Sequence, residues 1–307
     1  MPARESIFGS SSERELFTTI NSGWADRFAV YPSLPFATVI ELGGLDLKHS
    51  EREFLLKTSI DYTLCTKRGR PLLSIEFDGL SHGFSRRGRY VQMHECHDSA
   101  RDWKLDLKTR IASTADFPFV VVSYDEKNPI GESTHLTIVD GIVGQMLAHR
   151  DLRHRLRNLY AENQLEIDAA DAEYHDAYIQ QLVTDAETLA ELEWDPIARA
   201  EADIEGGLHR RGLICSHSVE WFHEPPLPDL PSGGFLALGF AEALKACADA
   251  MRRSIWVGCK ATVQTPATAV TETVRMRNIE HAGVNPLGLT ENMAMLLACQ
   301  QVERSAA

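Results

Sequence analysis

The sequence predicts an α/β sandwich in which a helix, three strands, a second helix and a fourth strand follow one another along the first 125 residues. Three observations lead to this fold class. A serine-capped helical pattern opens the chain, two alternating apolar segments flank a short basic turn, and a continuous apolar run follows a second helical pattern. A helix bundle or a closed barrel would not combine the two periods in this order.

Each element is predicted from its own period. SSSERELFTTI (10–20) is expected to be the first helix because Leu16, Phe17 and Ile20 share one face behind a serine cap. The basic turn KRGR (67–70) joins the second and third strands, so these two strands are expected to form a hairpin. The strands are expected over 36–42, 57–65, 71–79 and 117–124, and the second helix over 99–114.

Composition excludes several classes of protein. The chain has 307 residues and is 44% hydrophobic, which suits a globular protein of about two domains. The longest apolar run (233–251) contains Glu242 and Lys245, so no membrane-spanning helix is expected. The N-terminus lacks the apolar core of a signal peptide, which predicts a cytoplasmic location. Six scattered cysteines without a CxxC pair predict neither a disulfide framework nor a zinc ribbon.

The net charge of -13 is concentrated in one segment. Residues 161–205 contain 14 acidic residues and one base, Arg199, and therefore account for the whole of it. Residues 1–130 contain 17 bases and 18 acids. The charge argument against a nucleic-acid partner therefore applies to the acidic segment alone.

The polar face of the predicted hairpin carries three carboxylates. Glu76 and Asp78 alternate with the apolar positions of LLSIEFDG, and Asp61 lies on the polar face of the preceding strand. Three anions that converge on a small volume repel one another unless a cation joins them, and Mg²⁺ or Mn²⁺ takes such oxygen ligands. Asp61, Glu76 and Asp78 are therefore candidate metal ligands. The alternative is an edge strand whose polar face lies in solvent.

These residues carry a family resemblance. Asp61 at a strand start, IEFDGLSH (75–82), a helix with Asp102, Lys104 and Lys108, and a following apolar strand resemble the PD-(D/E)XK nuclease superfamily. The pattern is most similar to the branch of the very-short-patch repair endonucleases, which reads D, then E-x-D-G-x-x-H, then D and a base on the next helix.

The resemblance covers about residues 10–125 and implies a restriction-endonuclease-like αβββαβ core and a metal-dependent endonuclease that hydrolyses DNA. RNA is not excluded as a substrate. In this pattern Asp61 and Glu76 correspond to metal-binding carboxylates. His82 corresponds to a histidine near the attacking water or the leaving group, and Glu13 to a first-helix glutamate that supports the site.

The sequence departs from the superfamily pattern at Asp78, which stands where a catalytic lysine is usual. A lysine of the following helix can take its place, and the candidates are Lys104 and Lys108. Lys108 is favoured because its distance along the chain to Pro118 fits the family spacing better. The alternative is that both lysines are solvated on an exposed helix face.

Two basic segments are candidates for phosphate contact. SRRGR (85–89) contains Arg86, Arg87 and Arg89, which are expected either to bind DNA or to lie in a solvated loop. A helix expected over 137–162 also carries basic residues that either extend a basic surface or pair with the acidic segment: His149, Arg150, Arg153, His154, Arg155 and Arg157.

The predicted organisation is a nuclease-like domain (1–135), a helical acidic connecting arm (136–206) and a small α+β domain (207–307). The last domain can recognise the target, form a homodimer or bind a protein partner. Its strands are expected over 213–222, 254–264 and 269–278, and its helices over 235–253 and 289–302.

The predicted function is a divalent-metal-dependent DNA endonuclease of restriction, phage defence or DNA repair. A catalytically inactive nuclease fold that acts as a binding or scaffolding protein is the alternative, because Asp78 replaces the usual lysine.

Overall fold

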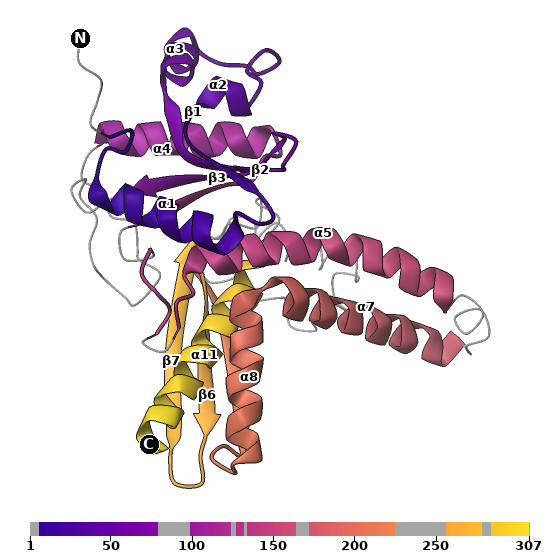
Figure 1. Ribbon diagram of the computed structural model, residues 1–307. Coiled ribbons are helices and arrows are strands. Elements are labelled where there is room, and N and C mark those ends of the chain that lie inside the picture. Colours follow the sequence, from indigo (N-terminus) through magenta and orange to yellow (C-terminus); the bar gives the residue numbers. More distant parts are fainter. Residues whose placement is uncertain are drawn as a thin grey trace. The chain divides into compact units, whose positions relative to one another are not determined.

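The computed structural model describes residues 6–78, 99–123, 127–131, 134–163, 172–224, 256–277 and 284–306 (Figure 1). The chain forms two compact units, one of Met1–Pro129 with Thr137–Val139 and one of Ile130–Leu136 with Asp140–Ala307. Each unit combines helices with a small sheet, so the predicted mixed α/β class is confirmed. Among the described helices, none is long and apolar enough to cross a membrane.

The first unit is built on a four-stranded mixed sheet of order β1-β2-β3-β4. β1 and β2 pair antiparallel, β2 and β3 pair antiparallel, and β3 and β4 pair parallel. A parallel pair needs a crossover connection, and α4 lies within it. The elements are α1 (Ser11–Trp24), β1 (Ala29–Pro35), α2 (Phe36–Val39), α3 (His49–Lys57), β2 (Ser59–Cys65), β3 (Pro71–Asp78), α4 (Ser99–Thr114) and β4 (Phe119–Ser123).

The predicted hairpin of β2 and β3 is present. Its turn places Gly69 at φ 84°, a conformation that glycine adopts without steric cost, and the N–H of Thr66 donates to the carbonyl of Arg70. The polar face of the hairpin is buried rather than solvated, because the hydroxyls of Thr63 and Ser74 are fully buried and lie 3.0 Å apart. Since β3 lies between β2 and β4, the alternative of a solvated edge strand is wrong.

The first predicted strand is misplaced. Residues 36–39 form the short helix α2, residues 40–42 are irregular, and the strand β1 comes before them. β1 contains Pro32 and Pro35, which argue against a strand in sequence reasoning. An edge strand tolerates proline because one of its sides has no neighbour to receive an N–H, and β1 pairs only with β2.

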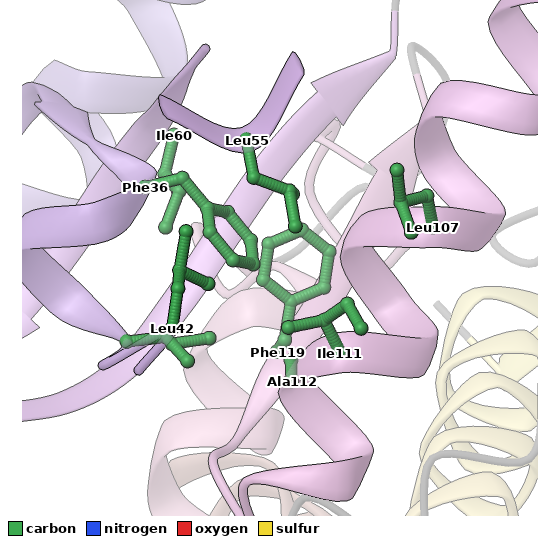
Figure 2. Close-up of a cluster of buried hydrophobic side chains, with 9 residues drawn as sticks. Phe36, Leu42, Leu55, Ile60, Leu107, Ile111, Ala112 and Phe119 are labelled. Carbon is green, nitrogen blue, oxygen red and sulfur yellow. The ribbon is translucent and has the colours of Figure 1, made fainter. Parts of the chain in front are cut away.

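The apolar residues of 36–42 belong to a buried cluster instead (Figure 2). α3, which the sequence did not predict, contributes Leu55 to this cluster, and the Glu51 carboxylate at its start accepts a hydrogen bond from the N–H of Lys48 (2.9 Å). α4 contributes residues on either side of Lys108. The cluster comprises Phe36, Ile40, Leu42, Leu55, Ile60, Leu107, Ile111, Ala112 and Phe119.

The second unit contains an antiparallel sheet of order β5-β6-β7, against which α11 packs. Its predicted strands and last helix are confirmed, whereas the helix expected over 235–253 lies outside the described residues. The predicted division between residues 206 and 207 falls inside α8, and both sides of it lie in this unit. The elements are α5 (Ile138–Glu162), α7 (Ala172–Trp194), α8 (Pro196–Arg210), β5 (Ser216–Glu224), β6 (Trp256–Gln264), β7 (Ala269–Arg277) and α11 (Pro286–Ala306).

Candidate functional site

Two candidate carboxylates occupy opposing positions of the hairpin. The β2–β3 register pairs Thr63 with Ser74 and Tyr62 with Ile75. Asp61 and Glu76 are the next residues along the two strands, each two positions from the Thr63–Ser74 pair and therefore on its face. Opposing residues of an antiparallel pair project from the same face, so the sheet directs both side chains to the same side.

Asp61 is held by the backbone of the neighbouring strand. Its Oδ2 accepts a hydrogen bond from the N–H of Phe77 at 2.8 Å. Burial and the nearby charge of Glu76 raise the pKa of Asp61 to about 7, while the Phe77 N–H and the Lys108 ammonium oppose this rise. The charge of Glu76 is the second largest cause of this rise, after burial.

Lys108 brings a positive charge to these carboxylates from α4. Its side chain is 5% exposed, and its Nζ donates to Oε1 of Glu76 at 2.5 Å and to the carbonyl of Ser59 at 2.8 Å. Leu107 and Ile111 on the same helix are buried in the apolar cluster and fix the helix against the sheet.

Lys104 is exposed and lies one turn earlier on the same helix. Of the two candidate lysines, the structure therefore brings Lys108 to the carboxylates, and the alternative of two solvated lysines does not hold for it. The catalytic role of Lys108 stays a prediction.

Glu13 lies near Asp61, but its side chain and its main-chain carbonyl accept hydrogen bonds from other residues. Its Oε2 accepts from the N–H of Gly9 at 2.7 Å, and its main-chain carbonyl accepts from the hydroxyl of Tyr62 at 2.6 Å. The Glu13 charge contributes to the raised pKa of Asp61, after the larger effects of burial and Glu76. The Tyr62 hydroxyl thus ties α1 to the strand that carries Asp61.

The remaining candidates are not placed by the described residues. The backbone of Asp78 ends β3 and pairs with Ser123 of β4, but its side chain lies outside the described part. His82 and the three arginines of the basic loop (Arg86, Arg87 and Arg89) also lie outside the described residues.

The donor set of the cluster fits a hard divalent ion. Among the described side chains, no three His, Cys, Asp or Glu residues form a metal-binding group. Asp61 and Glu76 nevertheless form a pair of carboxylates with a single ammonium beside them, which leaves one negative charge when both carboxyls are ionised. Mg²⁺ is commonly bound by one or two carboxylates, with water completing its coordination.

Sequence reasoning missed the backbone groups that orient the side chains of Asp61 and Lys108. The carbonyl of Ser59 accepts from Lys108, and the N–H of Phe77 donates to Asp61. Neither contact has a signal in side-chain patterns, because every residue except proline carries both groups.

Comparison with known proteins gives no relative from which a role could be transferred. No protein-family model matches the chain, and no curated protein or solved structure matches it significantly.

Proposed function

We propose that the protein is a divalent-metal-dependent endonuclease that hydrolyses DNA phosphodiester bonds, with a restriction-endonuclease-like core in its first unit. The observation that carries the proposal is the convergence of Asp61, Glu76 and Lys108 from β2, β3 and α4. The first unit has the order α1, β1, α2, α3, β2, β3, α4 and β4, which differs from αβββαβ by the two helices between β1 and β2. The parallel pairing of β4 with β3 across α4 supports a core of this kind. Restriction, phage defence or DNA repair is the setting that we propose for this activity.

Asp61 and Glu76 would hold Mg²⁺ or Mn²⁺ through their carboxylate oxygens. When bound, the ion supplies a Lewis acid that lowers the pKa of a water and stabilises negative charge on a phosphodiester oxygen. The N–H of Phe77 fixes the rotamer of Asp61, and the ammonium of Lys108 orients Glu76. The ammonium of Lys108 also provides positive charge to the transition state, in which the phosphate carries additional negative charge.

The test is incubation of the protein with supercoiled plasmid in Mg²⁺ or Mn²⁺, with and without a chelator. Asp61→Ala and Glu76→Ala are each expected to abolish cleavage and to leave the fold intact, as judged by circular dichroism. Glu53→Ala removes an exposed carboxylate of α3 and serves as the matched control that keeps full activity. Near wild-type cleavage in either site variant would contradict the assignment.

A specific observation favours the alternative of an inactive nuclease fold that binds a partner. The ion pair of Lys108 with Glu76, together with an Asp61 carboxyl whose pKa is about 7, brings the cluster close to neutrality without any metal. The same experiment separates the two functions. A folded protein that cleaves neither plasmid nor linear single-stranded or duplex DNA with either ion would support the binding role.

A further inference from the structure

Helix α5 carries a dense basic segment. Residues 149–157 read HRDLRHRLR and contain four arginines and two histidines against the single acid Asp151. The following helix α7 lies in the acidic segment, which raises the question of whether these arginines are neutralised within the second unit. The contacts of the two helices give the answer.

α5 and α7 run side by side in opposite directions (Figure 1). Nε2 of Gln145 donates to Oε1 of Glu191 at 3.3 Å, and the hydroxyl of Tyr178 donates to Oδ1 of Asn163 at 3.2 Å. These two contacts join the start of α5 to the end of α7 and the region after α5 to the start of α7. One face of α5 is therefore covered by the acidic helix.

Arg155 belongs to the covered face. Its guanidinium pairs with Asp151 at 2.6 Å and with Glu193 of α7, and the indole N–H of Trp194 donates to the same Asp151 carboxylate. Carboxylates of the second unit therefore neutralise the positive charge of Arg155. Arg155 is thus a packing residue and not a candidate for an external partner.

Three other arginines lie on the opposite face. At 3.6 residues per turn, Arg150, Arg153 and Arg157 fall within an arc of roughly 60°, on the side of the helix away from Arg155. All three are exposed. Among the described residues, no carboxylate forms an ion pair with Arg153 or Arg157. We call Arg150, Arg153 and Arg157 the arginine face of α5.

The positive charges of the arginine face affect the pKa of the neighbouring His149. Nη2 of Arg153 lies 3.2 Å from Nε2 of His149. Burial, followed by the positive charges of Arg153 and Arg150, lowers the pKa of His149 below its usual value. Arg153 and Arg157 are thus positive charges that no described carboxylate pairs with, and an approaching anion can contact them directly.

We infer that the arginine face of α5 binds the sugar–phosphate backbone of DNA, as a contact surface in the second unit separate from the cluster of Asp61, Glu76 and Lys108. This inference rests on the proposed function, which makes DNA the polyanion that the protein must hold. The three arginines extend over about 10 Å of helix, enough to reach successive phosphates of one strand. Planar guanidinium groups bind phosphate oxygens in pairs, and such contacts carry no sequence preference.

The test measures DNA binding without cleavage. Binding of the full chain to a fluorescent duplex is followed by anisotropy in chelator, from 50 to 200 mM salt. The double variant Arg153→Gln with Arg157→Gln is expected to bind roughly 10- to 100-fold more weakly, and its salt dependence should fall by about two counterions. Arg153→Lys with Arg157→Lys keeps the charges but loses the paired guanidinium contacts, so it is expected to keep the salt dependence of the wild type and to bind more tightly than the double glutamine variant.

The matched control is Arg199→Gln with Arg210→Gln, which makes the same change in net charge with exposed arginines of α8. It is expected to bind like the wild type, which separates local contact from overall charge. Absence of DNA binding by the wild type, or equal losses in both double variants, would overturn the inference. A change of oligomeric state in sedimentation of the Arg153 and Arg157 variant, with DNA binding unchanged, would instead assign the face to an acidic protein surface and overturn it too.

The outcome is independent of catalysis. A protein that binds DNA through Arg153 and Arg157 but cuts nothing with Mg²⁺ or Mn²⁺ would refute the nuclease and leave the binding surface standing. A protein that cuts plasmid, yet binds DNA equally well without the two arginines, would support the nuclease and refute the binding surface.

Discussion

Nζ of Lys108 lies 2.5 Å from Oε1 of Glu76, although 32 positions of sequence separate the two residues. The pair is buried, and the same ammonium also donates to the carbonyl of Ser59. A buried ion pair stabilises a fold only weakly, because both charges must leave water. The pair therefore adds little to stability, and substitution of Lys108 tests whether it serves the proposed chemistry.

Binding of the metal ion should raise the free energy of unfolding. Mg²⁺ or Mn²⁺ is expected to stabilise the wild type by about 2.7 kcal/mol when the free ion is at 100 times its Kd. Asp61→Asn should lose this effect and should unfold at a higher temperature than the metal-free wild type, because it removes a buried charge that repels Glu76. Thermal unfolding with and without the ion gives both results. An Asp61→Asn variant stabilised by Mg²⁺ as strongly as the wild type would contradict the metal assignment.

Replacing Lys108 and replacing Lys104 should affect the cleavage rate and the stability differently. Lys108→Met is expected to lower the cleavage rate at least about 100-fold with little change in DNA affinity, because it removes charge from the reacting centre. It should also destabilise the protein by about 3 kcal/mol, since Glu76 would be left buried without its ammonium. Lys104→Met is the control on the exposed face and should have a milder effect on both. Single-turnover cleavage and anisotropy distinguish these outcomes, and the reverse order would show that Lys104 is the catalytic residue.

Stability should fall as the pH rises through the range of a buried glutamic acid. Burial and the adjacent Glu205 carboxylate raise the pKa of Glu201 to about 8, whereas its ordinary value is 4.5. Between these values the folded state keeps a proton that the unfolded state loses, so the free energy of unfolding decreases by up to about 1.4 kcal/mol per pH unit. The neighbouring groups that share this field are Glu205, Glu291, Cys299, His209 and His217.

Glu201→Gln cannot ionise, so it should match the wild type near pH 5 and exceed its stability increasingly up to pH 8. Urea unfolding at several pH values measures the difference. Glu220→Gln, on a side chain that is 73% exposed, is the control and should leave the pH profile unchanged. Parallel profiles of the wild type and Glu201→Gln would show that Glu201 titrates normally in the folded protein.

A glycine of α5 should resist replacement. A Cβ at Gly144 would lie 2.6 Å from Cα of Asp195 and 2.8 Å from the carbonyl oxygen of Trp194, which are backbone atoms and cannot move aside. Gly144→Ala is therefore expected to destabilise the protein by about 1–3 kcal/mol despite the better helix propensity of alanine. Gly207→Ala in α8, where the nearest atom is 4.0 Å away at the end of the Arg210 side chain, should instead gain up to about 1 kcal/mol. Equal effects in chemical unfolding would contradict the close packing at Gly144.

Periodicity predicted the parts of the fold that depend on one face being apolar. The hairpin, α4 and β4 follow this rule, because a slip of one residue would turn Ile75 and Phe77 away from the core. β1 does not follow it, since an edge strand accepts Pro32 and Pro35 that a central strand would reject. The apolar run after β1 (36–42) predicts a strand from sequence alone, because a short buried helix and a short buried strand have the same composition.

The site could be predicted only in part for a different reason. Asp61 and Glu76 were found by strand alternation, which also fixes their common face. Lys108 was distinguished from Lys104 by a spacing argument, and the structure gives the physical cause: Leu107 and Ile111 are buried, and this orientation of α4 turns Lys108 inward. The backbone acceptor at Ser59 had no signal in the sequence.

The position of Lys108 on α4 also has a consequence for how the chain folds during its synthesis. β2 and β3 are joined by a short turn, and both precede α4 in the chain, so both are made before it. Until α4 has been made, it cannot shield Asp61 and Glu76 from water, which solvates both ionised carboxylates. The helix that closes this face is made later, and it carries the neutralising ammonium with it. α4 therefore cannot close over the two carboxylates without also bringing the ammonium of Lys108 to them.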